Sequence, residues 1–226
     1  AAGLIAVVLL VLSATVRAET VLLGSDTEQS EFASWTAYWG GGTTFSNEAA
    51  GGNPGGWLEV TFDPTVEDPP ADEWREIAYV SAGNIFAGTW DTSGIIEFDF
   101  WQSSTVADGL AIRWSADENP DGAWWSYTLV PGATNAWTTY SASLSDWTDW
   151  AYPFSTEEQY LADLATIDWI GIYMYRATAD EEIYGIDNVE LWAVIPEPAE
   201  CILLIAASIS SAISLRRKRK AACASA

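Results

Sequence analysis

Alternation of apolar and polar side chains, with a period of two residues, dominates the middle of this 226-residue chain. The alternation is regular over residues 57–62 and again over residues 95–101. In the second stretch it separates one set of side chains, Glu97, Asp99 and Trp101, from another, Ile96, Phe98 and Phe100. Successive side chains of a β-strand point to opposite sides, so this pattern is typical of strands with one buried face.

Turn-forming residues divide the chain into many short segments. Clusters of Gly, Pro, Asn and Asp occupy residues 51–56 and 119–122, and such clusters separate strands. Six more strands are predicted, over residues 76–80, 110–115, 124–130, 137–144, 169–176 and 186–193. One short helix is predicted where Ser155 and Glu158 form a capping box ahead of apolar residues at helical spacing. Many short strands without alternating helices favour an all-β fold, a β-sandwich of the jelly-roll type.

Composition divides the chain into three parts. Residues 1–18 are predicted to be a secretory signal peptide, with an apolar core at Leu4–Leu12 and a small-x-small cleavage site at Val16-Arg17-Ala18. The signal has no initial Met and no basic leading segment, so it is expected to be truncated at its N-terminus. Residues 19–194 then form the exported domain, which is long enough for a single core, and residues 195–226 form a separate tail.

The charge of the exported domain is almost entirely negative. Only Arg75, Arg113 and Arg176 face 30 acidic residues there, a balance of −27, and the domain has no Lys or His. A surface of this sign repels phosphate backbones, so nucleic acid is not an expected partner. Adaptation to high salt and a specific role in holding cations both account for the acidity, and the sequence leaves the choice open.

The tail combines a proline-containing segment, an apolar stretch and a basic end. It runs from Pro196, Glu197 and Pro198 through the apolar residues 201–215 to Arg216, Arg217, Lys218, Arg219 and Lys220. The apolar stretch is predicted to be a transmembrane helix, with the basic cluster in the cytoplasm and the acidic domain outside. Cys201 and Cys223 flank this helix and are the only cysteines, so the exported domain is expected to contain no disulfide.

The order of these three elements resembles the PEP-CTERM sorting signal. That resemblance implies recognition by an exosortase-type processing enzyme in a Gram-negative bacterium that makes exopolysaccharide. It also implies a transient anchor in the inner membrane, cut near the Pro-Glu-Pro, and a final location at the cell surface or in the extracellular matrix. The resemblance covers residues 195–226 only, and Ala221–Ala226 extend beyond the basic cluster, where such tails usually stop.

Two regions of the exported domain resemble the galactose-binding-like jelly rolls, which include many carbohydrate-binding modules. Residues 169–173 and 185–191 resemble the closing strand pair of that fold. The opening segment of the fold has its counterpart in Glu31-Phe32, Trp35, Trp39 and residues 55–58. The resemblance implies a structural calcium ion between the opening segment and the closing strand, with Glu31 and Asp187 as ligands. A domain rich in carboxylates and lacking His and Cys suits Ca²⁺, which takes oxygen ligands.

All 14 Trp residues lie in the exported domain, and they supply candidate sugar-binding surfaces. Aromatic rings stack on the apolar face of a sugar ring, and neighbouring carboxylates accept hydrogen bonds from its hydroxyls. The candidate carbohydrate site has two parts. One is the adjacent pair Trp124 and Trp125, and the other is a short segment rich in aromatic residues with two neighbouring acids: Trp147, Trp150, Tyr152, Asp146 and Asp149. In a strand, one member of the adjacent pair must point away from the core. For any single Trp, a place in the core is the commoner outcome.

An enzymatic function has less support from the sequence. Without His there is no Ser-His-Asp or Cys-His pair, although a glycosidase needs only two carboxylates. The stretch Glu97-Phe98-Asp99-Phe100-Trp101-Gln102 resembles the E-x-D-x-x-E strand of sandwich-fold glucanases, but Gln102 stands in place of the third acid. The sequence therefore predicts a non-catalytic, exported β-sandwich that associates with polysaccharide. The alternatives are a calcium-binding structural or surface-layer component without specific sugar binding, and a sandwich-fold glycoside hydrolase.

Overall fold

A computed structural model describes residues 19–26, 32–38, 43–62, 75–80, 85–117, 123–152, 155–178 and 180–195. Residues 20–194 make up one folded unit. The predicted signal peptide, the Pro-Glu-Pro segment, the apolar helix 201–215 and the basic cluster lie outside the described residues, as do Glu31 and Trp39. Among the residues that are described, no helix has both the length and the apolar character needed to cross a bilayer.

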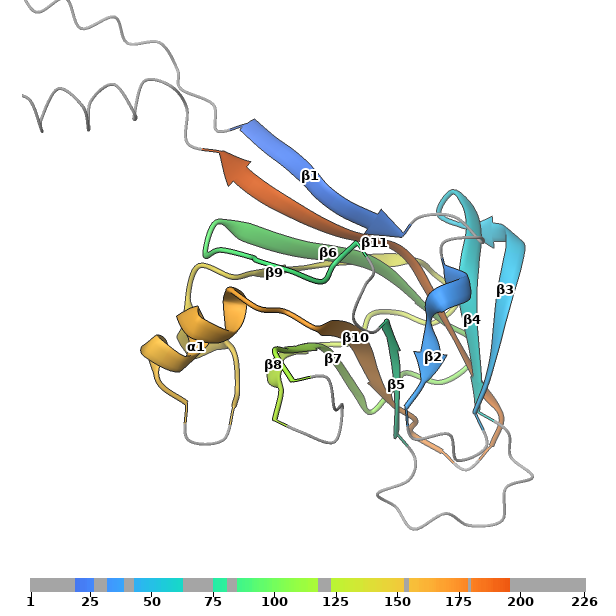
Figure 1. Cartoon of the computed structure of the whole chain (residues 1–226). Coiled ribbons are helices and arrows are strands. Elements are labelled where there is room, and N and C mark those ends of the chain that lie inside the picture. The colour runs from blue at the N-terminus through green and yellow to red at the C-terminus, as the bar shows by residue number, and fades with distance from the viewer. Residues whose placement is uncertain are drawn as a thin grey trace, which may run out of the picture. The chain divides into compact units, whose positions relative to one another are not determined.

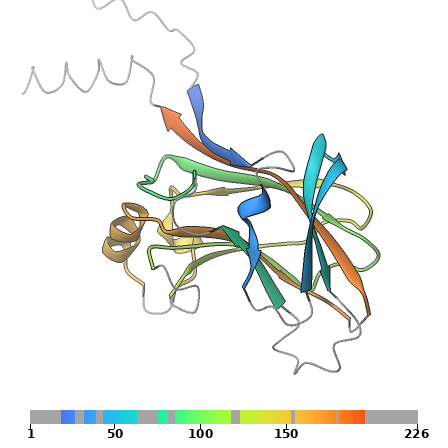
Figure 2. The ribbon, with the colours of Figure 1, turned by 45° about the vertical axis from the view of Figure 1, so that its right-hand side comes forward.

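Two β-sheets face each other across the core of this unit (Figure 1 and Figure 2). The six-stranded sheet has the order β3 (Thr43–Gly52), β4 (Gly55–Phe62), β11 (Glu182–Ile195), β6 (Gly94–Gln102) and β9 (Thr138–Ser143), and β1 (Glu19–Asp26) also pairs with β11. The five-stranded sheet has the order β2 (Thr36–Ala37), β5 (Arg75–Val80), β10 (Trp169–Tyr175), β7 (Gly109–Ser115) and β8 (Trp125–Leu129). The described connections include one α-helix, α1 (Glu157–Leu164), and two 3₁₀ turns, η1 (Phe32–Ser34) and η3 (Trp147–Asp149). The predicted all-β sandwich with one short helix is confirmed.

The core lies between the two sheets and follows the predicted alternation. On β6, Ile96, Phe98 and Phe100 are buried, and alternate residues of β4 repeat the pattern: Leu58, Val60 and Phe62. The five-stranded sheet contributes alternate residues of β7 and β10 to the same core: Leu110, Ile112, Trp114, Ile170, Ile172 and Met174. Each sheet therefore has one apolar face turned inward, and its remaining side chains are left to the outward face.

Large aromatic residues fill the end of the sandwich that carries α1. Trp114 stacks on Trp125 with ring centroids 5.8 Å apart, and Trp150 and Tyr160 contact Trp114 edge-on or tilted. All four are almost completely buried. The Trp125 indole donates to Asp163 at 2.9 Å and the Tyr160 hydroxyl donates to the Leu144 carbonyl at 3.1 Å, whereas the buried Trp114 indole N–H has no hydrogen-bond partner among the described residues. These rings stabilise a core that the described residues build without a disulfide.

Two local predictions are wrong in detail. The N-cap of α1 is Thr156, whose hydroxyl accepts a 3.2 Å hydrogen bond from the Gln159 amide, so the cap lies one residue later than Ser155. The sequence contains two overlapping box patterns, Ser155 with Glu158 and Thr156 with Gln159. The structure uses Thr156 as the cap, and the Gln159 side chain donates to Asp163 at 2.6 Å. The two closing strands, β10 and β11, lie in opposite sheets and do not pair with each other.

Candidate functional site

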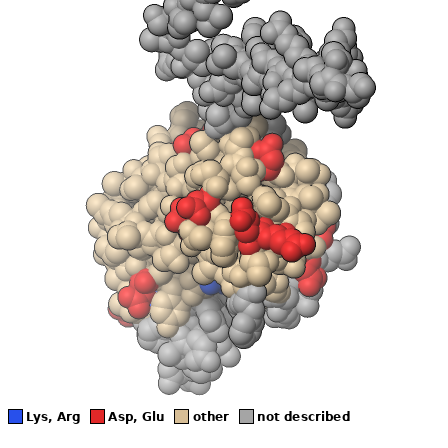
Figure 3. Space-filling model, turned by 90° about the vertical axis from the view of Figure 1, so that its left-hand side faces the viewer, with Lys and Arg blue, Asp and Glu red and all other residues tan. Residues whose placement is uncertain are grey.

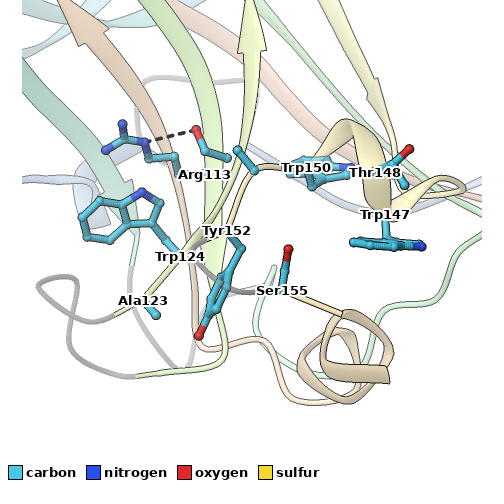
Figure 4. A pocket seen from close by; sticks show the side chains of 10 residues that line it. Arg113, Ala123, Trp124, Trp147, Thr148, Trp150, Tyr152 and Ser155 are labelled. Atoms are coloured by element: carbon cyan, nitrogen blue, oxygen red, sulfur yellow. Dashed lines mark hydrogen bonds between the residues drawn. The ribbon is translucent and has the colours of Figure 1, made fainter. Parts of the chain in front are cut away.

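A hollow of about 760 Å³ opens on the outward face of the five-stranded sheet, beside its edge strand β8 (Figure 4). Its volume falls within the roughly 300–1,000 Å³ of small-ligand sites. The described lining comes from β7, from β8 with the residues before it, and from the segment after β9: Arg113, Ala123, Trp124, Ser126, Trp147, Thr148, Trp150, Ala151, Tyr152 and Ser155.

The floor of the hollow follows from strand alternation. Arg113 lies between the buried residues Ile112 and Trp114 on β7, so its side chain points outward, and it pairs with Ser126 of β8. On its other side Arg113 faces Gly171 of β10, which has no side chain to occupy this face. The outward face of these three strands thus leaves room for one long side chain to lie across it.

Two aromatic rings flank the Arg113 guanidinium. Its central carbon lies 3.8 Å from the centroid of the Tyr173 ring and 5.0 Å from that of the Trp124 ring. The Arg113 Nε also donates a 3.4 Å hydrogen bond to the Ser126 hydroxyl, drawn as a dashed line in Figure 4. A cation within about 6 Å of an aromatic face is attracted by the ring quadrupole. The charge of Arg113 is therefore held in place by groups from β10, from β8 and from the residue that precedes β8.

The wall opposite Arg113 is an extension of the sheet by the segment 147–152. Ala151 and Ser126 exchange two backbone hydrogen bonds, of 2.9 and 3.0 Å, which attach this segment to the edge of β8. At its start Asp146 caps η3, accepting hydrogen bonds from the Thr148 hydroxyl at 2.7 Å and the Thr148 amide at 2.9 Å. Those hydrogen bonds hold the pKa of Asp146 below its ordinary value. The wall is thus fixed at both ends.

Aromatic packing positions the rings of the wall. Tyr152 stacks on the buried Trp125 with centroids 4.6 Å apart, and Trp150 packs against Tyr127 at 5.2 Å. The Trp150 indole donates to the Ser143 carbonyl at 3.0 Å. Burial raises the pKa of Tyr152, and the negative charges of Asp163 and Asp117 raise it further. Tyr152 therefore keeps its hydroxyl protonated well into the alkaline range.

The structure brings together part of the predicted carbohydrate site. Trp124, Trp147 and Tyr152 are half-buried and line the hollow, and Trp150 lines it with the edge of a ring that is 1% exposed. Trp125 does not line it, because the inward-facing position next to Trp124 places Trp125 in the core at 0% exposure.

The two predicted acids of this site lie apart from it. Asp146 and Asp149 are exposed and are not among the described residues that line the hollow. The 3₁₀ turn directs Asp146 toward its own backbone as a cap. Sequence reasoning did not identify Arg113 or Tyr173 as neighbours of the Trp residues. Both could be placed on the outward face by alternation, but joining them requires the order β10–β7–β8.

Acidic side chains dominate the visible charge around this end of the molecule. Figure 3 shows them scattered over one face, with a single small basic spot. Among the described residues that line the hollow there is no Asp or Glu, and the one charged side chain is Arg113. The hollow is therefore a locally basic, aromatic patch in an acidic domain.

A second aromatic group occupies the outward face of the six-stranded sheet. Trp57 contacts Trp101 and Trp137 edge-on, with centroids 6.0 and 5.7 Å apart. The indoles of Trp57 and Trp137 donate to the carbonyls of Ala50 and Gly51 at 3.1 Å each. These half-buried rings hold the β3–β4 hairpin against its own sheet.

The predicted calcium ligand Asp187 is buried at a bulge in β11. Its two carboxylate oxygens accept hydrogen bonds from the backbone amides of Asn53, at 2.5 Å, and Asn188, at 2.8 Å. These neighbours are N–H donors, whereas Ca²⁺ takes six to eight oxygen ligands, so the described surroundings of Asp187 do not fit the ion. In the part of the chain that the structure describes, no three His, Cys, Asp or Glu residues gather as a metal site would require. With Glu31 outside that part, calcium at this position stays a prediction.

The strand that resembles a glucanase motif lies in the six-stranded sheet. Asp99 is 4% exposed and accepts hydrogen bonds from Thr139 at 2.5 Å, Asn188 at 2.7 Å and Asn53 at 3.2 Å. Gln102, at the place of the missing acid, bridges Ala107 and Gly132 through its amide group. The side chains of Asp99 and Gln102 therefore make hydrogen bonds that link strands and loops.

Comparison with known proteins finds proteins of similar structure but none of similar sequence. No protein-family model matches the chain, and no curated protein sequence matches it significantly. The chain is similar to a family 11 carbohydrate-binding module of a cellulosomal cellulase of Clostridium thermocellum, at 20% identity and TM-score 0.49, over 80% of this chain and 97% of that one. It is also similar to a family 11 module from Clostridium thermocellum in complex with a β-1,3-1,4-mixed-linked tetrasaccharide, at 21% identity and TM-score 0.47, over 73% and 92% of the two chains. These neighbours are carbohydrate-binding-module β-sandwiches.

Proposed function

We propose that this chain is a non-catalytic β-sandwich that binds polysaccharide in the hollow beside β8. The observation that supports the proposal best is the lining itself. Three half-buried aromatic rings, those of Trp124, Trp147 and Tyr152, border one hollow of about 760 Å³ together with hydroxyl groups and one cation. Rings of this kind offer an apolar face to a sugar ring, and the polar groups around them fix its orientation.

The way in which the rings are held also favours binding. Tyr152 rests on a fully buried Trp, and the two hydrogen bonds between Ala151 and Ser126 tie its segment to β8. A ligand that meets rings already in position loses less conformational entropy than one that must order a loose loop. The rings of the hollow are therefore held in position before a ligand binds, which lowers the conformational entropy lost on binding.

The proposal extends to the route by which the protein reaches the polysaccharide. The tail carries Pro196, Glu197 and Pro198, the apolar stretch 201–215 and the basic cluster 216–220. We expect an exosortase-type enzyme to recognise this tail after it anchors the chain in the inner membrane, and then to release the domain to the cell surface. Pulse-chase labelling of the full chain should show a membrane-bound precursor becoming a smaller product, and Glu197→Ala should block that conversion.

Affinity electrophoresis tests the binding proposal. The full chain, in a detergent without a sugar headgroup, is run through gels that contain neutral or acidic polysaccharides, and a glycan array extends the range of ligands. We expect retardation by at least one polysaccharide, weakened by Trp124→Ala and by Trp147→Ala. Trp57→Ala is the matched control, because Trp57 is a half-buried Trp on the opposite sheet.

Two outcomes would contradict the proposal. One is a folded chain, with native near-ultraviolet circular dichroism, that is retained by no glycan. The other is release of reducing sugar from a bound polysaccharide that Glu97→Gln abolishes, since this would make the protein a hydrolase acting on the opposite sheet.

A further inference from the structure

We infer that the hollow selects anionic sugar residues, whose carboxylate or sulfate group pairs with Arg113. This inference rests on the proposed function and adds the class of ligand. The starting point is the chemistry of the described lining. Arg113 is its only charged side chain, and the other polar side chains are the hydroxyls of Ser126, Thr148, Tyr152 and Ser155. A guanidinium donates hydrogen bonds and accepts none.

The same lining argues against a neutral sugar as the preferred ligand. Neutral glycans are commonly held by carboxylates that accept hydrogen bonds from hydroxyl groups, and the sequence suggested Asp146 and Asp149 for that task. Asp146 instead accepts both hydrogen bonds of Thr148 as a cap, and neither acid is among the described lining residues. The described lining therefore has no carboxylate acceptor, and the Arg113 guanidinium, which only donates, matches an anionic acceptor on the ligand.

The placement of a cation here is unusual for this domain. Residues 19–194 contain three arginines and no lysine, against 30 acids. Arg176 is 3% exposed and lies 5.6 Å from the Phe62 ring, so it belongs to the interior. Arg113 is half-buried and lines the hollow beside β8. The domain thus exposes a positive charge where aromatic rings gather.

The packing of Arg113 suits a bidentate pair. The Tyr173 and Trp124 rings lie near the guanidinium, at 3.8 and 5.0 Å from its central carbon. Guanidinium groups that stack on aromatic rings still present N–H donors along their edges, and those edges match the two oxygens of a carboxylate. A sugar stacked on Trp124 would place the acidic group on its ring edge within reach of this fork.

The net charge of the domain limits the range over which Arg113 can attract an anionic sugar. A balance of −27 repels a polyanion at long range, so the attraction has to come from contact with Arg113. Screening over about 8 Å at physiological ionic strength suppresses the distant repulsion and affects a partly buried pair less. The selectivity is therefore expected at physiological salt with short oligosaccharides.

Isothermal titration calorimetry on the full chain, in a detergent without a sugar headgroup, tests the inference. The probes are tetragalacturonate, its fully methyl-esterified and hence neutral form, and a sulfated tetrasaccharide with a neutral backbone. We expect the free acid to bind about ten- to a hundredfold more tightly than the ester, the range of one charge-assisted hydrogen-bonded pair. Arg113→Gln should bring that ratio close to one, and Arg113→Lys should retain part of the ratio.

The outcomes separate the inference from the proposed function. Equal binding of acid and ester, or an unchanged ratio in a folded Arg113→Gln variant, overturns the inference and leaves polysaccharide binding intact. A folded chain that binds none of the probes, nor any other glycan, overturns both. Tighter binding of the sulfated probe, with the same dependence on Arg113, supports the inference and identifies sulfate as the anion. Circular dichroism and thermal melting of each variant establish that it is folded.

Discussion

At the scale of single residues, the structure separates two adjacent Trp residues into different roles. Trp125 is completely buried and stacks between Trp114 and Tyr152, whereas Trp124 is half-buried and borders the hollow next to Arg113. Strand alternation accounts for the difference, because neighbouring side chains point to opposite faces. One of the two is therefore a core residue, and the other is available to a ligand.

Substitution of each Trp by Ala should separate affinity from stability. Trp125→Ala removes a ring from the core and is expected to lower the free energy of unfolding by about 3–5 kcal/mol. Trp124→Ala is expected to cost less than about 1 kcal/mol of stability and to weaken polysaccharide binding about three- to tenfold, the value of one stacking contact. Urea unfolding and affinity electrophoresis measure the two effects. The assignment is wrong if Trp124→Ala unfolds the domain, or if it leaves affinity unchanged.

The carboxyl group of Glu190 should make stability depend on pH. Burial raises the pKa of Glu190 above its ordinary value of 4.5, and repulsion from Glu97 and Asp99 adds to this, although a hydrogen bond from Trp192 opposes it. Charging Glu190 is therefore harder in the folded state than in the unfolded state. Its protonated form stabilises the fold at low pH, and that contribution is lost as the pH rises through the raised value.

Glu190→Gln removes this charge and keeps an acceptor for Trp192. We expect the variant to gain stability relative to the native chain at pH 8, and to gain less at pH 5. Urea unfolding at the two pH values measures the difference, with Glu181→Gln as a control because Glu181 is exposed. A gain that is the same at both pH values would show that the charge of Glu190 is not destabilising.

At the scale of elements, the sequence predicted strands well where the two faces differ. Residues 57–62 and 95–101 alternate over most of their length, and both lie within strands, β4 and β6. Strand β3 was not predicted, because its residues 43–52 are polar or small apart from Phe45, and none of them is fully buried. A strand that is stabilised mainly by pairing with β4 needs no alternation of apolar and polar residues, so its sequence does not show the pattern from which strands are predicted.

The hollow could be predicted only in part for a related reason. Local sequence showed that Trp147, Trp150 and Tyr152 crowd one segment, and that one member of the Trp124–Trp125 pair must face outward. It could not show that the segment pairs with β8 through Ala151, or that β10 brings Tyr173 beside Arg113. Such contacts depend on strand order, which links residues far apart in the chain.

Capping of α1 gives a prediction for one element. Thr156→Ala removes the hydroxyl that accepts from the Gln159 amide, and it should lower the free energy of unfolding by about 0.5–2 kcal/mol. Ser155→Ala tests the overlapping box and should change stability by less than about 0.5 kcal/mol. The capping assignment would be reversed if Ser155→Ala proved the more destabilising of the two in urea unfolding.

At the scale of the whole molecule, charge should govern stability in dilute salt. Residues 19–194 carry 30 acids against three arginines, so their charges repel one another in the compact state. Raising NaCl from about 10 mM to about 300 mM shortens the screening length several-fold and should raise the melting temperature. A melting temperature that falls or stays constant would show that self-repulsion contributes little.

Calcium provides a matched comparison for this salt effect. At equal ionic strength CaCl₂ should raise the melting temperature as NaCl does, if screening is the only cause. A further rise that saturates with Ca²⁺ concentration would instead support a bound ion, as the resemblance at Glu31 and Asp187 implies.

The central claim is that polysaccharide binds on the outward face of the five-stranded sheet. Hydrogen–deuterium exchange of the full chain, with and without a polysaccharide that retards it, tests this claim directly. We expect added protection in peptides that cover residues 123–130 and 146–152, on both sides of the hollow, and no change in the β3–β4 hairpin that carries Trp57. Protection confined to that hairpin, with none at residues 123–130 or 146–152, would place the ligand on the opposite sheet and contradict the account.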